Sequence, residues 1–127
     1  MSEMRLSDYL GHIQKAATDA CDFVEGMGRD DFLHDNRTQQ AVVMSLIIIG
    51  EAAAKVMEKY AAFTRAHPEV PWINMRGMRN RIAHGYFDID FGIVWETVES
   101  ALPALLTRLP VMMQNTGDDI QQSGQNR

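Results

Sequence analysis

One stretch of the chain combines the side chains that bind and cleave phosphate esters. Residues 70–87 contain no acid, and their basic side chains are Arg76, Arg79, Arg81 and His84. The whole chain carries a formal net charge of -5 at pH 7, which argues against an extended electrostatic grip on nucleic acid. The basic window is therefore a local departure from the average, and it predicts a local anion-binding site.

These residue types are sufficient for cleavage of RNA without a metal. Histidine has an unperturbed pKa of ~6.5, so it can take and give protons near neutrality. Arginine stays charged and presents donors that fit phosphate oxygens. A base would remove the proton of a 2′-hydroxyl, an acid would protonate the leaving oxygen, and a cation would stabilise the charge on the phosphoryl group.

No metal or cofactor is expected. The single cysteine, Cys21, excludes a zinc site made of several thiolates and an internal disulfide, and it is interpreted as a small core residue. The histidines show no His-Glu-x-x-His spacing, nor do paired carboxylates flank them; they are His12, His34, His67 and His84.

An ordinary structural interpretation competes with the catalytic one. An arginine-rich helix end is usually a solvated face, and histidine near a helix C-terminus is favoured by the helix dipole. On these residues alone the ordinary interpretation is preferred. Arg79 and His84 are five residues apart, which is about 140° around an ideal helix. They can converge only if the helix ends at His84, if the arginine reaches around it, or if a second subunit completes the site.

Length and composition predict one globular domain in a reducing cytoplasm. The chain has 127 residues, of which 46% are hydrophobic and 23% charged. Residues 1–6 include an acid and no apolar signal core. The longest apolar run, residues 41–50, is far shorter than the ~20 residues that span a bilayer. We expect no membrane-embedded segment.

The hydrophobic periodicity predicts helices almost everywhere. The first should run from Leu6 to a turn near Gly26 or Gly28, followed by turn and N-cap candidates at Asp30, Asp31 and Asp35. A second should cover residues 36–62, and its apolar middle predicts a central position or a subunit interface. The prolines of residues 67–72 predict a loop.

Two further helices are predicted after the loop. One covers residues 73–84, with Gly85 as a left-handed cap. The other covers residues 90–109, with Pro103 bending or restarting it. The fold class is therefore all-α, an antiparallel bundle of four to five helices. Residues 1–112 should form the domain, and residues 113–127 a polar tail that is expected to be disordered.

The motif from Arg79 to Tyr86, Arg-Asn-Arg-Ile-Ala-His-Gly-Tyr, resembles the Arg-x4-His-x-Tyr signature of the HepT-like toxins, a branch of the HEPN superfamily of helical ribonucleases. Further blocks are similar in the same order and include Thr38-Gln-Gln-Ala-Val, Ile49-Gly-Glu-Ala-Ala, Pro68-Glu-Val-Pro-Trp, Tyr86-Phe-Asp-Ile-Asp and Val94-Trp-Glu-Thr-Val. The resemblance covers essentially residues 6–109.

The resemblance implies roles for individual residues. Arg79 would hold the scissile phosphate, His84 would act as general acid or base, and Asn80 would support them by hydrogen bonding. Tyr86 would be modified with AMP by a cognate minimal nucleotidyltransferase, the antitoxin of the pair. The family also implies an obligate homodimer with two motifs facing one cleft, which would bring Arg79 of one half-site to His84 of the other.

Several residues keep two interpretations. Glu51 could be a buried acid directed at Arg79, or an ordinary helical partner of Lys55. Arg76 and Arg81 could bind flanking RNA phosphates or only face solvent. Trp95 is expected in the core, while Trp72 is a weak candidate for stacking a base. Tyr86, without the resemblance, would be interpreted as an anchoring aromatic.

Two functions follow. The first is the toxin of a toxin-antitoxin system, an endoribonuclease acting on tRNA or messenger RNA. The second is a non-catalytic helical module that presents Arg76, Arg79 and Arg81 to a nucleotide or to a nucleotidyltransferase. The sequence contains no feature that identifies the RNA.

Overall fold

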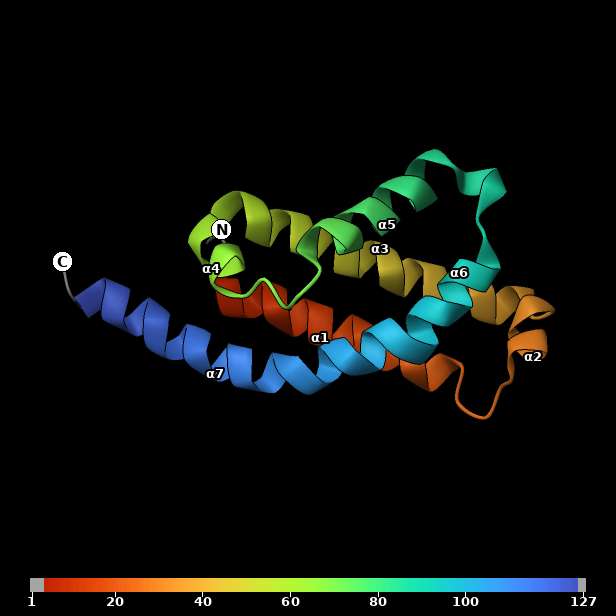
Figure 1. Ribbon diagram of the computed structural model, residues 1–127, viewed down its shortest axis with the longest axis horizontal. Helices are drawn as coiled ribbons and strands as arrows, with labels where there is room; N and C mark the ends of the chain where they lie inside the picture. Colours follow the sequence, from red (N-terminus) through yellow and green to blue (C-terminus); the bar gives the residue numbers. More distant parts are fainter. Residues whose placement is uncertain (1–3, 126–127) are drawn as a thin grey trace.

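The computed structural model describes residues 4–125, and the backbone alone at residues 115 and 117–125. Within that range the fold is all-α, as predicted, and contains no strand. Four longer helices run alternately in opposite directions (Figure 1); they are α1 (Leu6–Phe23), α3 (Asn36–Lys59), α5 (Trp72–His84) and α7 (Leu102–Gln125). Shorter elements connect them, namely α2 (Arg29–Leu33), α4 (Ala61–Ala66), the 3-10 turn η1 (Tyr86–Asp88), α6 (Phe91–Glu96) and the π-helical turn η2 (Thr97–Ala101).

Helix α3 occupies the centre of the fold, as its apolar middle predicted. It packs against α1 on one side and α5 on the other, while α7 packs on α1 (Figure 1). By length and composition α3 could also cross a membrane, but half of its most apolar window is buried inside the protein. Its buried side chains, which include Val42, Leu46, Ile49 and Val56, form part of the core. The high hydropathy of α3 is thus accounted for by its central position.

Helix α1 follows its predicted apolar stripe and ends earlier than expected. Leu10, Ile13 and Ala17 are fully buried. The helix ends at Phe23, and the left-handed glycine of the following turn is Gly26, with φ of 81°. Cys21 is half-buried against the core, and burial raises the pKa of its thiol.

The predicted second helix is divided into α3 and α4. Tyr60, with φ of -133° and ψ of 52°, leaves the helical region, so the backbone turns before α4 begins. This turn lets Phe63 enter the core, where its ring lies 6.1 Å from that of Trp72. The boundary between α3 and α4 is therefore set by the packing of Phe63 on Trp72, a tertiary contact that helix propensity cannot predict.

The last predicted helix begins where expected, at Phe91 after the N-cap Asp90, but it differs in its middle and at its C-terminal end. It starts as α6, widens into the π-helical turn η2, and continues as α7. The amide of Leu102 donates to the carbonyl of Thr97, five residues back, so Pro103 falls in the first turn of α7, where its missing donor matters little. The expected end near Leu109 is wrong, because α7 passes Pro110 and reaches Gln125.

Packing explains why α7 continues past Pro110. Leu109, Met112 and Thr116 are all buried, which offsets the cost of an interior proline, about 3 kcal/mol. The expected disorder of residues 113–127 and the domain boundary at residue 112 stay predictions. Arg127 and Asn126 lie outside the described residues.

The N-terminus of α3 is capped by Asp35, as predicted. The backbone N–H of Thr38 donates to the Asp35 carboxylate at 3.0 Å, and this hydrogen bond is the main cause that lowers the pKa of Asp35 below its ordinary 3.8. A lowered pKa means that the charged cap stabilises the fold above the unfolded pKa, and that this contribution is lost as the pH falls through the folded pKa.

We therefore expect Asp35→Asn to keep a helix cap but to remove the pH-dependent contribution of Asp35 to the free energy of unfolding. Urea denaturation at a series of pH values from 7 to 3 should show the parent losing stability relative to Asp35→Asn only below about pH 4. Asp35→Ala, which lacks a cap at every pH, should be less stable than both at pH 7. A constant difference between parent and Asp35→Asn across the series would contradict this assignment.

Candidate active site on helix α5

Helix α5 carries the predicted site and begins on a buried anchor. Trp72 is its first residue; its side chain is buried, and the indole Nε1–H donates to the carbonyl oxygen of His67 at 3.0 Å. The stacking role considered for Trp72 is therefore wrong, because no base can reach a buried ring. Trp95 lies in the core as predicted, with its ring 5.5 Å from that of Phe32.

A glycine allows α5 to lie directly on α3. Gly50 of α3 is buried beneath α5, and a Cβ built there would clash with Cβ of Arg79 and come within 2.8 Å of the carbonyl oxygen of Met75. Both obstacles are at or next to the backbone of α5, so neither can rotate away. The two helices can approach this closely only because residue 50 has no side chain.

The close approach places Arg79 against the neighbouring residue of α3. Its Nη1 is ion-paired with Glu51 Oε1, and its Nε–H donates to Asn80 Oδ1 at 2.8 Å. The Arg79 side chain is 22% exposed and that of Glu51 is 55% exposed. The structure thus brings together Arg79, its predicted supporting residue Asn80, and Glu51.

Of the two interpretations of Glu51, the contact with Arg79 is the one observed. Lys55 instead pairs with Glu58 at 3.8 Å. Glu51 is not a buried acid, however, because more than half of its side chain is exposed. Residues 70–87 contain no acid in the sequence, but in the fold Glu51 of α3, 28 residues before Arg79, lies beside them.

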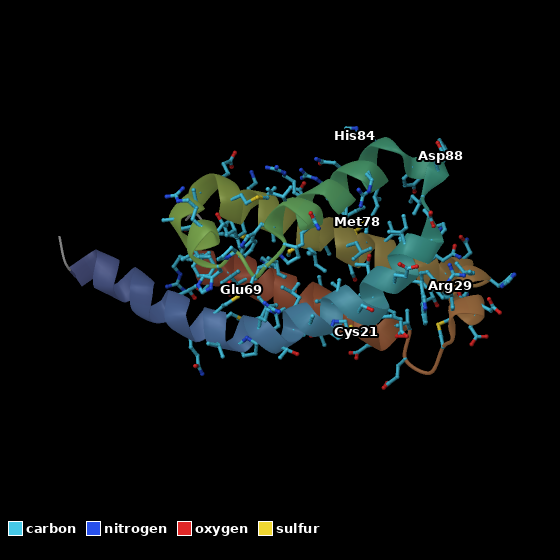
Figure 2. All side chains as sticks on the ribbon, viewed as in Figure 1. Cys21, Arg29, Glu69, Met78, His84 and Asp88 are labelled. Atoms are coloured by element: carbon cyan, nitrogen blue, oxygen red, sulfur yellow. The ribbon has the colours of Figure 1, made fainter. Side chains whose placement is uncertain are left out.

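His84 is the last residue of α5 and lies apart from Arg79. Figure 2 shows it on the outer side of α5, away from α3, and it is exposed. The helix does end at His84, which was one route to convergence, yet no hydrogen bond or ion pair of the described residues joins the two side chains. Gly85 has φ of -123°, so the expected left-handed cap is wrong.

Tyr86 follows in the turn η1, where it is largely exposed. Its side chain is 67% exposed, and that of Phe87 is 95% exposed. The two rings make a T-shaped contact with centroids 5.6 Å apart. An anchoring role for Tyr86 is therefore wrong for this chain, because most of the residue is exposed to solvent. Phe87, the last residue of the acid-free window, is an exposed aromatic for which the sequence predicts no role.

The other two arginines flank the site differently. Arg76 is half-buried on α5 and Arg81 is exposed. Arg81 lies at the edge of an apolar groove of about 500 Å³ between α5 and the α6–α7 segment. Leu46 and Ile49 of α3 line this groove, together with Ile73, Met78, Ile93 and Leu105. Beneath the groove, α5 makes its most extensive contacts with α3.

The arrangement can hold a phosphate and move a proton without a built metal site. Arg79 offers a fixed cation, and His84 offers an accessible imidazole on the same helix. Among the described residues, no group of three or more histidine, cysteine, aspartate or glutamate side chains is placed to hold a metal ion. The protein is therefore of an all-α class whose candidate site consists of helix-borne arginine and histidine.

Comparison with known proteins identifies the family. Residues 13–112 match the family described as "Ribonuclease HepT-like". A protein described as "Probable ribonuclease HepT" from Thermococcus cleftensis is 40% identical over 98 residues, which are 77% of this chain and 86% of the relative. One described as "Putative RNase TTE0752" from Caldanaerobacter subterraneus subsp. tengcongensis is 34% identical over 106 residues, 84% of this chain and 92% of the relative. No solved structure matches this chain. The chain belongs to the HepT-like ribonuclease family.

Proposed function

We propose that this protein is a metal-independent endoribonuclease and the toxin of a toxin-antitoxin pair in the cytoplasm. The observation that carries the proposal is the pair of Arg79 and His84 on α5, with Arg79 held in place by Glu51 and Asn80, in a chain whose relatives are described as ribonucleases. The substrate is RNA, either tRNA or messenger RNA.

The proposed reaction has one cleavage step. The 2′-oxygen attacks the adjacent phosphorus as its proton is removed, and the bond from phosphorus to the 5′-oxygen breaks. The 5′-oxygen leaves with a proton, and the upstream fragment ends in a 2′,3′-cyclic phosphate. His84 takes or gives one of these protons, and Arg79 stabilises the charge on the phosphoryl oxygens.

The site would be completed by a homodimer. Arg79 faces α3 whereas His84 lies on the outer side of α5, so one protomer does not join them. Two copies that face each other across a twofold axis would place Arg79 of one beside His84 of the other. The dimer would thus bring together an arginine and a histidine that a single copy of α5 holds apart.

The experiment that tests the function uses purified protein and cellular RNA in EDTA. Cleavage should persist, and sequencing of the product ends should recover 2′,3′-cyclic phosphates. If EDTA abolishes cleavage and Mg²⁺ restores it, the metal-independent mechanism is wrong. If no RNA is cleaved under any condition, the enzymatic proposal is wrong.

Silencing of the toxin by a cognate minimal nucleotidyltransferase is proposed to act on Tyr86. Tyr86 is exposed and follows His84 by two residues, so an attached AMP would place bulky anionic charge over the phosphate-binding arginine.

We expect incubation with the partner and ATP to add the mass of AMP to intact protein. Tyr86→Phe should block the addition and stay toxic in the presence of the antitoxin. Modification of Tyr86→Phe to the same extent would contradict the assignment.

One observation favours a second function. Because Arg79 pairs with Glu51 on α3 while His84 lies on the outer side of α5 (Figure 2), one protomer does not join the catalytic pair, and α5 then serves as a non-catalytic surface that presents Arg76, Arg79 and Arg81 to a nucleotide or to the nucleotidyltransferase. Expression of the protein alone separates the two functions. Growth arrest that His84→Ala relieves supports the enzyme, and absence of growth arrest supports the binding module.

A further inference from the structure

The guanidinium of Arg79 is held at two of its three nitrogens. Nε–H donates to Asn80 Oδ1 at 2.8 Å, and Nη1 is paired with Glu51 Oε1. A guanidinium has five N–H donors, so three remain for another ligand, two on Nη2 and one on Nη1. With two acceptors at different nitrogens, the plane of the group cannot rotate without breaking a hydrogen bond.

The position of Glu51, the acceptor on α3, relative to α5 is fixed by helix packing. Gly50 precedes Glu51, and its missing side chain sets how closely α5 approaches α3. Glu51 comes from a central helix that is packed on both sides, whereas Asn80 is the sequence neighbour of Arg79 and moves with it. Of the two acceptors, only Glu51 therefore ties the arginine to the body of the protein.

From this geometry we propose that Glu51 is a positioning residue, which fixes the Arg79 guanidinium so that its three remaining donors are ready for a phosphate. The inference rests on the proposed ribonuclease function and deepens it. An arginine side chain loses considerable conformational entropy when it is fixed in one rotamer. If Arg79 is already fixed before RNA binds, this entropy is not lost during the reaction. Preorganised donors stabilise developing charge better than mobile ones.

The same carboxylate could have the opposite effect. The negative charge of Glu51 beside Arg79 repels an incoming phosphate, so in this competing role Glu51 would inhibit its own site. The two roles predict changes of opposite sign when the carboxylate is removed. Single-turnover cleavage with saturating RNA therefore separates them.

The variants are Glu51→Ala and Glu51→Gln. If Glu51 positions Arg79, Glu51→Ala should cleave roughly tenfold to a hundredfold more slowly at saturating RNA. Its KM should change less than its rate. Glu51→Gln should recover much of the rate, because the amide oxygen still accepts from Nη1. A rate of Glu51→Ala equal to or above that of the parent would overturn the proposal.

Glu58→Gln is the matched control. Glu58 lies on the same helix, is also exposed, and pairs with Lys55 rather than with the site. It removes the same charge, and its cleavage rate should equal that of the parent. If Glu58→Gln lowers the rate as much as Glu51→Ala does, the effect comes from net charge and the positioning role is wrong.

A measurement without RNA separates this inference from the proposed function. Nuclear magnetic resonance can follow the exchange of the Arg79 Nε–H with water, with the signal assigned by its loss in Arg79→Lys. The exchange should be faster in Glu51→Ala than in the parent and unchanged in Glu58→Gln. Equal exchange in Glu51→Ala and the parent would overturn the positioning role. Failure of the parent to cleave RNA, with faster exchange in Glu51→Ala, would overturn only the proposed function.

Discussion

Replacement of His84 by alanine is expected to lower the rate of RNA cleavage by about 10²- to 10⁴-fold, the range typical of a lost general acid or base. The fold should be unaffected, because His84 is exposed at the end of α5. The measurement is single-turnover cleavage in EDTA, with the circular dichroism spectrum as the check on folding. Cleavage by His84→Ala at the parental rate would remove His84 from the mechanism.

Arg79→Ala should cost a similar factor, for a different reason. Arg79 is asked to stabilise transition-state charge, so its loss should lower the rate more than the loss of Arg76, which shares α5 and its charge but has no ion pair to α3 among the described residues. Arg76→Ala is therefore the control. Equal losses in the two variants would show that the phosphate-binding arginine has been assigned wrongly.

The two inactive variants also test the dimer. If Arg79 of one protomer works with His84 of the other, then a mixture of Arg79→Ala and His84→Ala forms heterodimers that contain one intact composite site. Such a mixture should regain a measurable part of the parental rate after subunit exchange. No recovery would mean that each site draws both residues from one chain.

Replacement of Gly50 by alanine is the second change with a large expected effect. Alanine usually stabilises a helix interior relative to glycine by about 0.5–1 kcal/mol. Here the added Cβ would meet the backbone carbonyl of Met75 at 2.8 Å and clash with Arg79. We expect Gly50→Ala to destabilise the fold by about 2 kcal/mol, the range of an overpacked core, and to slow cleavage by moving Arg79.

The control for Gly50 is another helical glycine. A Cβ at Gly11 of α1 would meet nothing within 4 Å. Gly11→Ala should therefore be neutral or more stable than the parent, and urea denaturation of both variants compares them directly. Gly50→Ala with the same stability as Gly11→Ala would show that the α3–α5 approach tolerates a side chain.

The elements of the fold could be predicted because their signals are local. The apolar stripe of α1, the cap at Asp35 and the prolines before α5 each involve residues a few positions apart. The boundaries that were wrong depend on long-range packing. The break at Tyr60 and the passage of α7 beyond Pro110 follow from core contacts of Phe63 and Met112, which periodicity does not reveal.

The candidate site divides in the same way. Arg79, Asn80 and His84 lie on one helix and were found from their spacing and from the family resemblance. For Glu51 the sequence favours neither interpretation, because Arg79 is 28 residues away and Lys55 is an equally good local partner. Only the tertiary structure, which sets α5 on Gly50, decides between them.

Helix α5 buries few of its residues compared with α1. Of its thirteen residues only Trp72 and Ile82 are buried, whereas α1 buries seven. A segment with few buried contacts opens at a lower free energy than the whole protein. Helix α5 is therefore expected to open locally at a lower free energy than α1. The fraction of molecules in which Arg79 contacts Glu51 should then depend on this local opening more than on global unfolding.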